Sequence, residues 1–446
     1  MQETLLNRLI ELLLRPVPEA VLMRARLHLL DWLGCAVHGH GEIGSMLAET
    51  LKSSGAAPGS GPCRGLFHGS VGWQDALQIN AGLGNVGEMD DVHRTSTLHP
   101  GPVVIPVALA LAQQRGRPLI EALRAMVIGY ECAIRIGRTL GAAHYARFHN
   151  TATMGTPAAA AAASALLGLD RERTGWAIAN ALSRTGGLWQ MRHEDVLTKQ
   201  WHCIAAALDG TAAAQLAGAG ISGPASILEG EQGLYAAMAP DARPDQLIQG
   251  DADDWMIGEV SFKPWPACRH AHAALDAALR ARSELPDGAE IERAEVFTYA
   301  DALKFCDNPE PGTDLQAKFS LQHCTALVMA GCEIDLDGFV ASGEGFDRLR
   351  GARSRVSVAV REDFDSAYPQ HYGACVRLHT ADGGAVSAEV SDALGDPEAP
   401  MSRAMLLDKA AHLMAAGGLN RARSEALQSW ALESDWNAPV GGDILP

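Results

Sequence analysis

The sequence predicts a mainly α-helical protein, with a large all-α domain and a smaller inserted α+β lid domain. Apolar residues recur at helical spacing through much of residues 1–258 and again over 398–446. Residues 259–397 instead contain runs rich in β-branched residues with alternating polarity, which is typical of strands. We therefore expect the chain to leave the helical domain near Gly258 and to return to it near Met401.

Five apolar runs support the helical prediction. The first extends from Leu22 to Trp32 after Pro18, and Gly34 is expected to end it. The other helices are expected over residues 103–112, 118–140, 156–168 and 204–218. Alanine and glycine dominate the last two runs, and such small residues let neighbouring helices approach closely.

The strands of the inserted segment are expected over residues 292–299 and 354–361, with a helix over 320–334 between them. Asp382-Gly383-Gly384 separates two further runs, 374–380 and 385–391, and predicts a β-hairpin. The chain beyond Asn437 is expected to be a loose tail.

Composition limits the possible partners. The chain has 446 residues, 47% of them hydrophobic, which is enough for two domains and a large core. A net charge of −17 argues against nucleic acid or an anionic membrane as partner. The sequence suggests neither a signal peptide nor a transmembrane segment, and none of the nine cysteines forms a Cys-x-x-Cys pair. We expect a cytoplasmic protein with reduced thiols and no bound metal.

The first cluster of reactive side chains spans Glu88 to Pro102 and precedes an apolar helix. It contains the adjacent acids Asp90 and Asp91, together with Arg94 and His99. Histidine exchanges protons near neutral pH, a neighbouring carboxylate can fix its tautomer, and arginine can bind a carboxylate. The alternative is a polar loop that caps the following helix.

Three further stretches contain candidate residues. His149 lies before an alanine-rich helix, where it could donate to an anion or simply belong to a loop. Lys199 lies between apolar residues, so we expect it to be partly buried. Arg269, His270 and His272 follow the proline-rich segment that begins at Lys263, and we interpret them as a cationic lip of a pocket rather than as metal ligands.

Taken together, these stretches are similar to the MmgE/PrpD family along nearly the full chain. No single stretch is diagnostic, but their order and spacing are specific. They are Leu29 to Cys35, Asp90-Asp91 with His99-Pro100, Gly129-Tyr130-Glu131, His149 with Gly155-Thr156, Thr198-Lys199 with His202, Gly223-Pro224 through Gly230, Lys263-Pro264 with Cys268-Arg269-His270 and His272, and Lys318-Phe319-Ser320.

The resemblance implies an enzyme with its active site between the helical domain and the lid, and a homodimer formed through the helical domain. Known activities of the family are 2-methylcitrate dehydration, cis-aconitate decarboxylation and iminodisuccinate epimerisation, none of which needs a metal or organic cofactor. The catalytic residues that the resemblance implies are Asp90, Asp91, His99, His149, Lys199 and His272. On chemical grounds we add Arg94, Arg269 and His270 as substrate-binding residues, with Lys199 in that role as well.

The expected substrate is a small di- or tricarboxylate, and the leading expectation is a hydro-lyase. An epimerase of a substituted succinate, a decarboxylase and a non-catalytic carboxylate-binding protein remain open alternatives. Three departures from the family pattern bear on the substrate. Glu88 and Val92 replace residues common in the family, the segment from Asp91 to His99 is one residue longer than in decarboxylases, and Phe305 lies where animal decarboxylases have a tyrosine.

Overall fold

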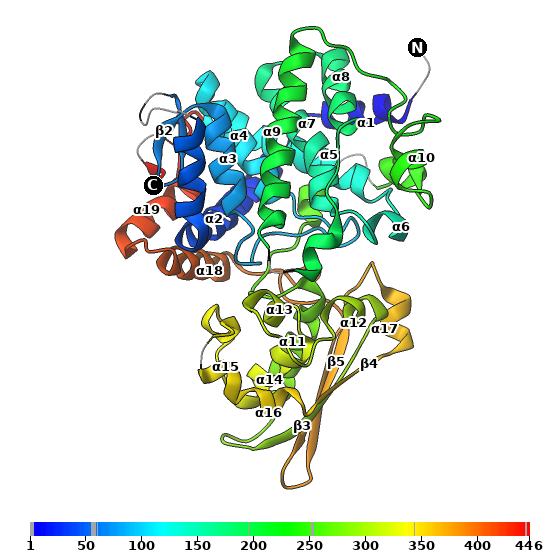
Figure 1. Cartoon of the computed structure of the whole chain (residues 1–446), viewed down its shortest axis with the longest axis vertical. Helices are drawn as coiled ribbons and strands as arrows, with labels where there is room; N and C mark the ends of the chain where they lie inside the picture. Colours follow the sequence, from blue (N-terminus) through cyan, green and yellow to red (C-terminus); the bar gives the residue numbers. More distant parts are fainter. Residues whose placement is uncertain are drawn as a thin grey trace. The chain divides into compact units, whose positions relative to one another are not determined.

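The computed structural model describes residues 4–54, 59, 61–194, 196–250, 254–342, 344–441 and 444–446. The chain divides into two compact units, both visible in Figure 1. The helical unit comprises residues 1–86, 90–260 and 402–446, and the inserted unit comprises residues 87–89 and 261–401. The fold is mainly α, which confirms the predicted fold class. No helix among the described residues is long and apolar enough to cross a membrane.

The helical unit consists almost entirely of helices, joined by loops and three 3₁₀ turns (Figure 1). The α-helices are α1 (Leu5–Leu13), α2 (Glu19–Ser54), α3 (Trp73–Leu83), α4 (Gly101–Arg115), α5 (Leu119–Gly137), α6 (Ala142–Tyr145), α7 (Asn150–Leu167), α8 (Arg171–Leu182), α9 (Thr198–Gly218), α10 (Leu234–Met238), α18 (Arg403–Ala416) and α19 (Arg421–Glu433). The 3₁₀ turns are η1 (Trp189–His193), η2 (Pro244–Ile248) and η3 (Met256–Glu259).

Helix α7 is at the centre of this unit. It packs against α4, α5, α8 and α9, and every residue from Asn150 to Ser164 is buried. Because most of these residues are alanine, threonine or glycine, the neighbouring helices can approach on all sides. The helix begins at Asn150, earlier than the expected start at Thr156-Pro157. Pro157 has no N–H for the Thr153 carbonyl, and the Thr185 hydroxyl donates to that oxygen instead.

Three other expectations were wrong. Helix α2 continues past Gly34 to Ser54, and a Cβ added at Gly34 would lie 3.1 Å from Cα of Ala410, so this glycine permits close packing with α18 rather than ending the helix. A two-stranded antiparallel hairpin, β1 (Cys63–Gly65) and β2 (Gly69–Val71), interrupts the helices. The end of the chain is packed, because Leu119 N donates to Ala438 O at 2.9 Å and Leu445 is buried.

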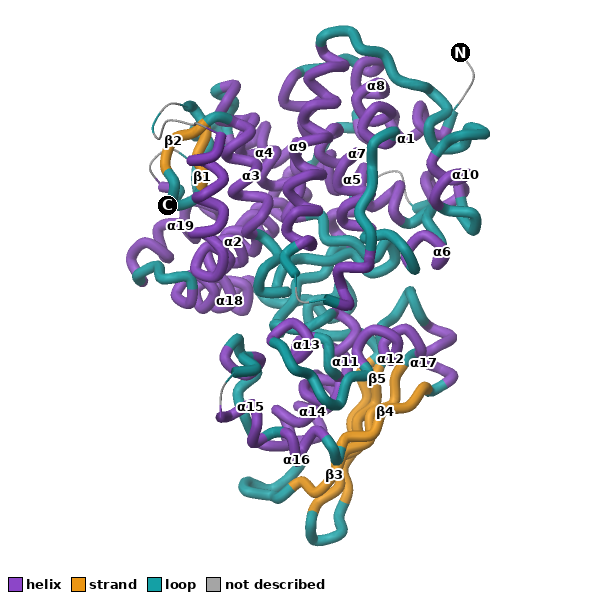
Figure 2. The backbone as a smooth tube through the Cα atoms, in the orientation of Figure 1, coloured by secondary structure: helices purple, strands orange, loops and turns teal. Residues whose placement is uncertain are grey.

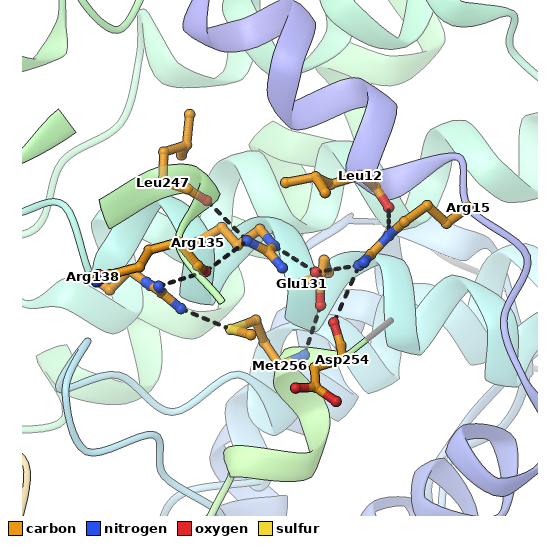
Figure 3. A network of polar contacts seen from close by, with 9 residues as sticks. Leu12, Arg15, Glu131, Arg135, Arg138, Leu247, Asp254 and Met256 are labelled. Carbon is orange, nitrogen blue, oxygen red and sulfur yellow. Dashed lines mark hydrogen bonds and ion pairs between the residues drawn. The ribbon is translucent and has the colours of Figure 1, made fainter. Parts of the chain in front are cut away.

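Glu131 on α5 joins four segments of the helical unit (Figure 3). Its Oε1 accepts from Arg15 Nη2 at 2.7 Å and from Arg135 Nε at 2.5 Å, and its Oε2 accepts from Met256 N at 2.7 Å. Arg135 also donates to Leu247 O at 3.1 Å. Buried charge is stable only when it is paired and hydrogen-bonded, and here the pairing fixes α5 relative to η2 and η3.

The inserted unit is built around a four-stranded sheet, drawn in orange in Figure 2. The strand order is β4-β3-β5-β6, with β3 (Ile291–Thr298) parallel to β4 (Val356–Val360) and antiparallel to β5 (Ala374–Thr380). β5 and β6 (Ala385–Val390) form the predicted hairpin, which the structure confirms. The expected strands and the expected helix all lie within a few residues of their observed positions.

Helices α11 (Arg269–Ser283) and α14 (Leu321–Ala330) pack against this sheet. The chain between β3 and β4 makes the crossover that a parallel pair requires. The remaining helices of the unit are α12 (Ala300–Cys306), α13 (Asp314–Lys318), α15 (Glu344–Arg348), α16 (Arg350–Arg353) and α17 (Glu362–Ala367), with the 3₁₀ turn η4 (Asp337–Phe339). The first turn of α11 therefore carries all three candidate residues of this unit on an element fixed by its own core.

Candidate active site

Asp91 is the centre of a buried network in the helical unit. Its Oδ2 accepts from His28 Nδ1 at 2.7 Å and from Tyr130 OH at 2.6 Å, and its Oδ1 accepts from Gly101 N at 3.0 Å. These donors come from α2, α5 and α4. A carboxylate that accepts three hydrogen bonds has little capacity left for a substrate proton, so these contacts favour a positioning role for Asp91.

The ring of His99 is held by the backbone carbonyl of Asp91 and the side-chain carboxylate of Asp90. Its Nδ1 lies 2.9 Å from Asp91 O and 3.0 Å from Asp90 Oδ2. Both neighbours are acceptors, so we assign the hydrogen to Nδ1 and leave Nε2 as the atom that exchanges a proton. Because Asp91 is anchored to three helices, the carbonyl that orients His99 is fixed as well.

The start of α7 holds the same loop from the other side. Asn150 Nδ2 donates to Ser96 O and to Thr97 Oγ1, both at 2.8 Å. His99 N donates to Thr151 Oγ1 at 3.0 Å. The structure thus brings together two of the predicted clusters, the loop at residues 90–99 and the start of α7. Arg94 lies buried in the same loop, where its carbonyl accepts from Thr97 N at 3.0 Å.

His149 precedes α7 and is fully buried. Its Nδ1 lies 3.0 Å from Nδ1 of His202, and its Nε2 has no hydrogen-bond partner among the described residues. Burial lowers the pKa of His149 well below its ordinary value, and the charges of Lys199, His202 and His99 lower it further, against a smaller opposing effect of Asp90. The ring is therefore neutral near neutral pH, with one nitrogen unoccupied.

Three residues around His149 were missing from the predicted site. Trp189 packs on its ring at a centroid distance of 4.6 Å, and His202 lies beside it. Gly187 has a φ of +123°, and an added Cβ would lie 2.4 Å from Cβ of Ala152, so only glycine lets the 185–189 segment pass this close to α7. Its carbonyl accepts from His149 N at 3.0 Å. His202 belongs to the same stretch as Lys199, which was the available sequence signal.

Lys199 lies in the first turn of α9 and is partly exposed. Its charge lowers the pKa of His149 and of His202, after the larger effect of burial in both cases. Partial burial agrees with the expectation from the apolar neighbours. The helical unit therefore contains Lys199, three histidines and the carboxylate of Asp90 in one electrostatically coupled group, and Asp91 holds one of these histidines, His99, through its carbonyl.

A third carboxylate, Asp31, lies close to this group. It is buried on α2 and its Oδ1 accepts from Lys409 Nζ at 2.5 Å. Burial raises the pKa of Asp31 to about 6, where Lys409 opposes the rise and Asp91 and Asp90 add to it. Lys409 is therefore a further buried cation of the helical unit.

A cavity of about 560 Å³ opens beside His202 within the helical unit. It is bounded by α7, α9 and the segment that contains η1. Its charged and polar lining includes Arg184, Glu194, Thr198, His202 and Asp209, and its apolar lining includes Trp201.

In the inserted unit, both ring nitrogens of His272 and the two terminal nitrogens of Arg269 have internal partners, whereas Arg269 Nε has no hydrogen-bond partner among the described residues. Arg269 Nη2 lies 2.5 Å from Asp396 Oδ1, and both side chains are buried. Arg269 Nη1 donates to His272 Nδ1 at 3.1 Å, and His272 Nε2 donates to Ala267 O at 3.1 Å. Since arginine can only donate, His272 is neutral with its hydrogen on Nε2. These contacts favour positioning roles for both residues.

His270 lies in a cage of aromatic rings. Its Nδ1 hydrogen-bonds to Tyr299 OH at 2.8 Å, and its ring stacks on Phe305 and Tyr372 at 5.0 and 5.2 Å. Burial lowers the pKa of His270 to about 3, and the charges of Arg269, Lys263 and Lys304 add to this. A neutral His270 lacks the positive charge that was expected of a cationic lip.

Lys263 is a buried cation of the inserted unit that was not among the predicted site residues. Its Nζ donates to Glu88 O at 3.0 Å and lies 3.6 Å from Glu88 Oε2. Glu88 belongs to the short segment 87–89 that this unit includes, and it has a φ of +58°. The predicted motif at residues 88–102 is thus divided, with Glu88 in one unit and Asp90 onward in the other.

Comparison with known families decides where this chain belongs. The MmgE/PrpD N-terminal domain model matches residues 4–247, and the MmgE/PrpD C-terminal domain model matches residues 265–434. The chain belongs to the MmgE/PrpD family. This confirms the resemblance expected from the motifs. The site residues of the helical unit fall within the first match, and Arg269, His270 and His272 fall within the second.

Several similar members of the MmgE/PrpD family carry the name of one activity. A cis-aconitate decarboxylase-like protein of Aspergillus oryzae is 27% identical over 309 residues, 65% of this chain and 63% of that protein. Cis-aconitate decarboxylase of Aspergillus terreus is 23% identical over 419 residues, 88% of this chain and 85% of that protein. The human cis-aconitate decarboxylase is 30% identical over 266 residues, 55% of this chain and 53% of that protein.

Proposed function

We propose that this protein is a lyase that performs acid–base chemistry on a small di- or tricarboxylate without a bound cofactor. One observation carries the proposal: the buried, neutral His149 has an Nε2 without a partner among the described residues, and it is coupled to His99 and Lys199. A buried polar atom without a hydrogen bond is costly, so its persistence points to a partner that arrives with a ligand.

The chemistry follows from these groups. Loss of carbon dioxide or of water from a polycarboxylate develops negative charge on a carbon next to a carboxylate. One group must exchange a proton with that carbon, and a cation must stabilise the developing charge. We assign proton exchange to Nε2 of His149 and Nε2 of His99, and stabilisation of a substrate carboxylate to Lys199.

Decarboxylation is the first reaction to test, because three similar relatives are named for cis-aconitate decarboxylation. In that reaction the C–CO2 bond breaks, its electron pair stays on the substrate, and one proton is added to carbon to give an unsaturated dicarboxylate. Dehydration is the second candidate. It is favoured by Phe305, which stacks on His270 and offers no hydroxyl where animal decarboxylases have a tyrosine.

The other predicted residues receive supporting roles in this proposal. Asp91 fixes the loop that carries His99, and Asp90 orients the His99 ring. Arg269 and His272 hold the first turn of α11 through Asp396 and Ala267. A residue that acts through another should alter turnover less than His149 or His99 does.

The test is proton NMR in D2O with the purified protein and three acids, which are cis-aconitate, 2-methylcitrate and iminodisuccinate. A new unsaturated dicarboxylate from cis-aconitate identifies a decarboxylase, and an olefin from 2-methylcitrate identifies a dehydratase. Deuterium exchange of iminodisuccinate without loss of a group identifies an epimerase. Activity should survive dialysis against a chelator. Binding of these acids with neither product nor exchange would contradict the proposal and indicate a carboxylate-binding protein.

We also propose that the protein is a homodimer formed through the helical unit. The physical support is the large number of small apolar residues in this unit, which suits a close-packed interface. Light scattering at micromolar concentration should give twice the chain mass of 47.2 kDa. A monomeric mass would contradict this.

A further inference from the structure

The two facing histidines of the helical unit must share a hydrogen. Nδ1 of His149 and Nδ1 of His202 lie 3.0 Å apart, and two neutral ring nitrogens at this distance form a hydrogen bond only if one of them carries the proton. Imidazole has one hydrogen-bearing nitrogen and one lone pair when neutral. The tautomer of His202 therefore determines whether Nε2 of His149 is a proton donor or a proton acceptor.

His202 differs from His149 in its access to solvent. His149 is enclosed by α7, Trp189 and Gly187, whereas His202 lines the cavity of about 560 Å³. A proton that reaches His202 can therefore leave through the cavity, and a proton on His149 cannot leave except through His202 or a ligand at Nε2.

We propose that His202 sets the tautomer of His149 and relays its proton to the cavity, a role that rests on the proposed function. In one state His149 carries its hydrogen on Nδ1, so its Nε2 is a base. In the other state His202 carries the shared hydrogen on its own Nδ1, so His149 carries its hydrogen on Nε2 and is an acid.

The relay balances without any other reactant. When Nε2 of His149 takes a proton from substrate, its Nδ1 proton passes to Nδ1 of His202, and Nε2 of His202 releases one proton to solvent. Protonation of substrate runs the same steps in reverse, with a proton taken up from solvent. Each half-reaction moves one proton in and one out, so no imidazolium has to persist on the buried ring.

A purely structural histidine looks different in this same unit. His144 is also buried, but its Nδ1 faces Met238 O at 3.1 Å and its Nε2 faces Thr153 Oγ1 at 3.0 Å, so both nitrogens are occupied. Within the described part of the chain, the ring of His149 has His202 as its only hydrogen-bond partner. The His149–His202 pair is therefore arranged to exchange a proton, whereas His144 serves only to hold its neighbours together.

The charged groups around the pair oppose a resting positive charge on either ring. Burial lowers the pKa of His202, and Lys199 lowers it further. His149 is subject to burial, Lys199, His202 and His99, with Asp90 acting in the opposite direction. Arg184, Glu194 and Asp209 line the cavity beside His202. The carboxylates of Glu194 and Asp209 offer acceptors for the released proton.

Chemical rescue tests the relay. His202→Ala should lower kcat on cis-aconitate by on the order of 10²-fold while leaving KM nearly unchanged. Added imidazole should enter the cavity and restore turnover in a saturable way, because it can accept a proton at one nitrogen and release one at the other. 1-Methylimidazole has a single exchangeable nitrogen and should not restore it. Rescue by both compounds alike, or by neither, would overturn the relay.

Two controls separate the relay from a change in structure. His193→Ala removes a nearby exposed histidine of η1 and should need no rescue. His202→Gln fills the site and can bond to His149 but cannot pass a proton, so imidazole should not rescue it.

A second measurement does not depend on turnover. With 15N-labelled histidine, the ring nitrogens of His149 should show two exchanging tautomers in the wild type, and the tautomer ratio should change in His202→Ala, where Nδ1 of His149 loses its partner. Identical His149 shifts in both proteins would overturn the inference even if the proposed lyase activity is found. If the activity is absent but the tautomers change as expected, the proposed function fails and the coupling of the two rings stands.

Discussion

Two buried histidines at helix starts, His149 at α7 and His272 at α11, differ in how their ring nitrogens are used. At the start of α7, His149 has one ring nitrogen bonded to His202 and the other without a partner among the described residues. At the start of α11, His272 has one nitrogen bonded to Arg269 and the other to Ala267 O. Both rings are buried.

The difference indicates that the start of α7 takes part in the reaction, whereas the start of α11 holds the structure in place. A saturated, buried histidine has no atom left for a substrate and contributes rigidity, whereas an unsaturated one is costly unless it is used. The charge of Arg269 is likewise already paired, because its Nη2 lies 2.5 Å from the buried carboxylate of Asp396.

The largest expected effect is on turnover at the α7 region. His149→Gln should lower kcat on the productive acid by roughly 10²–10⁴-fold, and His99→Gln should have an effect of similar size, because each removes a proton-exchanging nitrogen. His272→Asn should keep kcat within about ten-fold and lower the free energy of unfolding by about 1–3 kcal/mol, because it loses the bond to Ala267 O.

Steady-state kinetics and urea unfolding of the same preparations check this contrast. His412→Gln, which changes an exposed histidine of α18, is the matched control and should change neither quantity. A His272→Asn variant that loses as much turnover as His149→Gln would reverse the comparison and make the α11 region part of the chemistry.

The second effect is on stability at the α11 region. Arg269→Met should lower the free energy of unfolding by about 3–5 kcal/mol, because it leaves the buried Asp396 carboxylate without its partner. Adding Asp396→Leu should recover part of the loss, since the double variant buries no lone charge. Urea unfolding measures both. Arg421→Ala, which breaks an exposed pair with Glu425, should change the free energy of unfolding far less than Arg269→Met does.

An Arg269→Met protein as stable as the wild type would show that this ion pair contributes little net free energy. If such a protein had also lost affinity for the carboxylate substrate, Arg269 would return to the substrate-binding role expected from the sequence.

The sequence predicted the elements well, because periodicity and turn residues are local signals. The β5–β6 hairpin follows directly from Asp382-Gly383-Gly384, and parts of α2, α4, α5, α7, α9 and α18 follow from their apolar spacing. The start of α7 was misplaced because Pro157 is tolerated inside the helix, where the hydroxyl of Thr185 replaces the lost donor. That compensation comes from a distant segment and has no local signature.

The candidate residues were also chosen by local chemistry, and this limited what could be predicted about their roles. Residue type and neighbours pointed to Arg269 and His272, but their internal partners are Asp396 and Ala267, and the first of these lies far along the chain. His202 was overlooked as a site residue for the same reason, because only the packing of α7 against α9 brings it to His149.

The third effect concerns substrate affinity. Lys199→Met should lower kcat/KM by about 10–100-fold, mainly through KM, because a charge-assisted bond to a substrate carboxylate contributes about 1.5–3 kcal/mol. Lys52→Met, at an exposed lysine of α2, should leave both parameters unchanged. A loss confined to kcat would instead assign Lys199 to proton transfer.

The smallest effect is on the pH dependence of stability, and it compares one buried histidine from each unit. Burial, opposed by the hydrogen bond to Asp91, lowers the pKa of His28 to about 4, and burial lowers that of His270 to about 3. In the unfolded chain both should titrate near about 6.5. Because the folded values are lower, each neutral ring contributes stability that is complete above the unfolded pKa and is lost as pH falls toward the folded value.

The free energy of unfolding should therefore decrease from neutral pH to about pH 5, with up to about 1.4 kcal/mol per pH unit from each of these histidines. Urea unfolding across this range gives the slope of the unfolding free energy against pH, which reports the number of protons taken up on unfolding. This number should be smaller by about one in His270→Asn and in His28→Asn. It should not change in His412→Asn. An unchanged slope in His270→Asn would mean that His270 is already protonated in the folded protein. His270 would then be a cation, and it would give the inserted unit a carboxylate-binding charge that Arg269, which is paired with Asp396, does not supply.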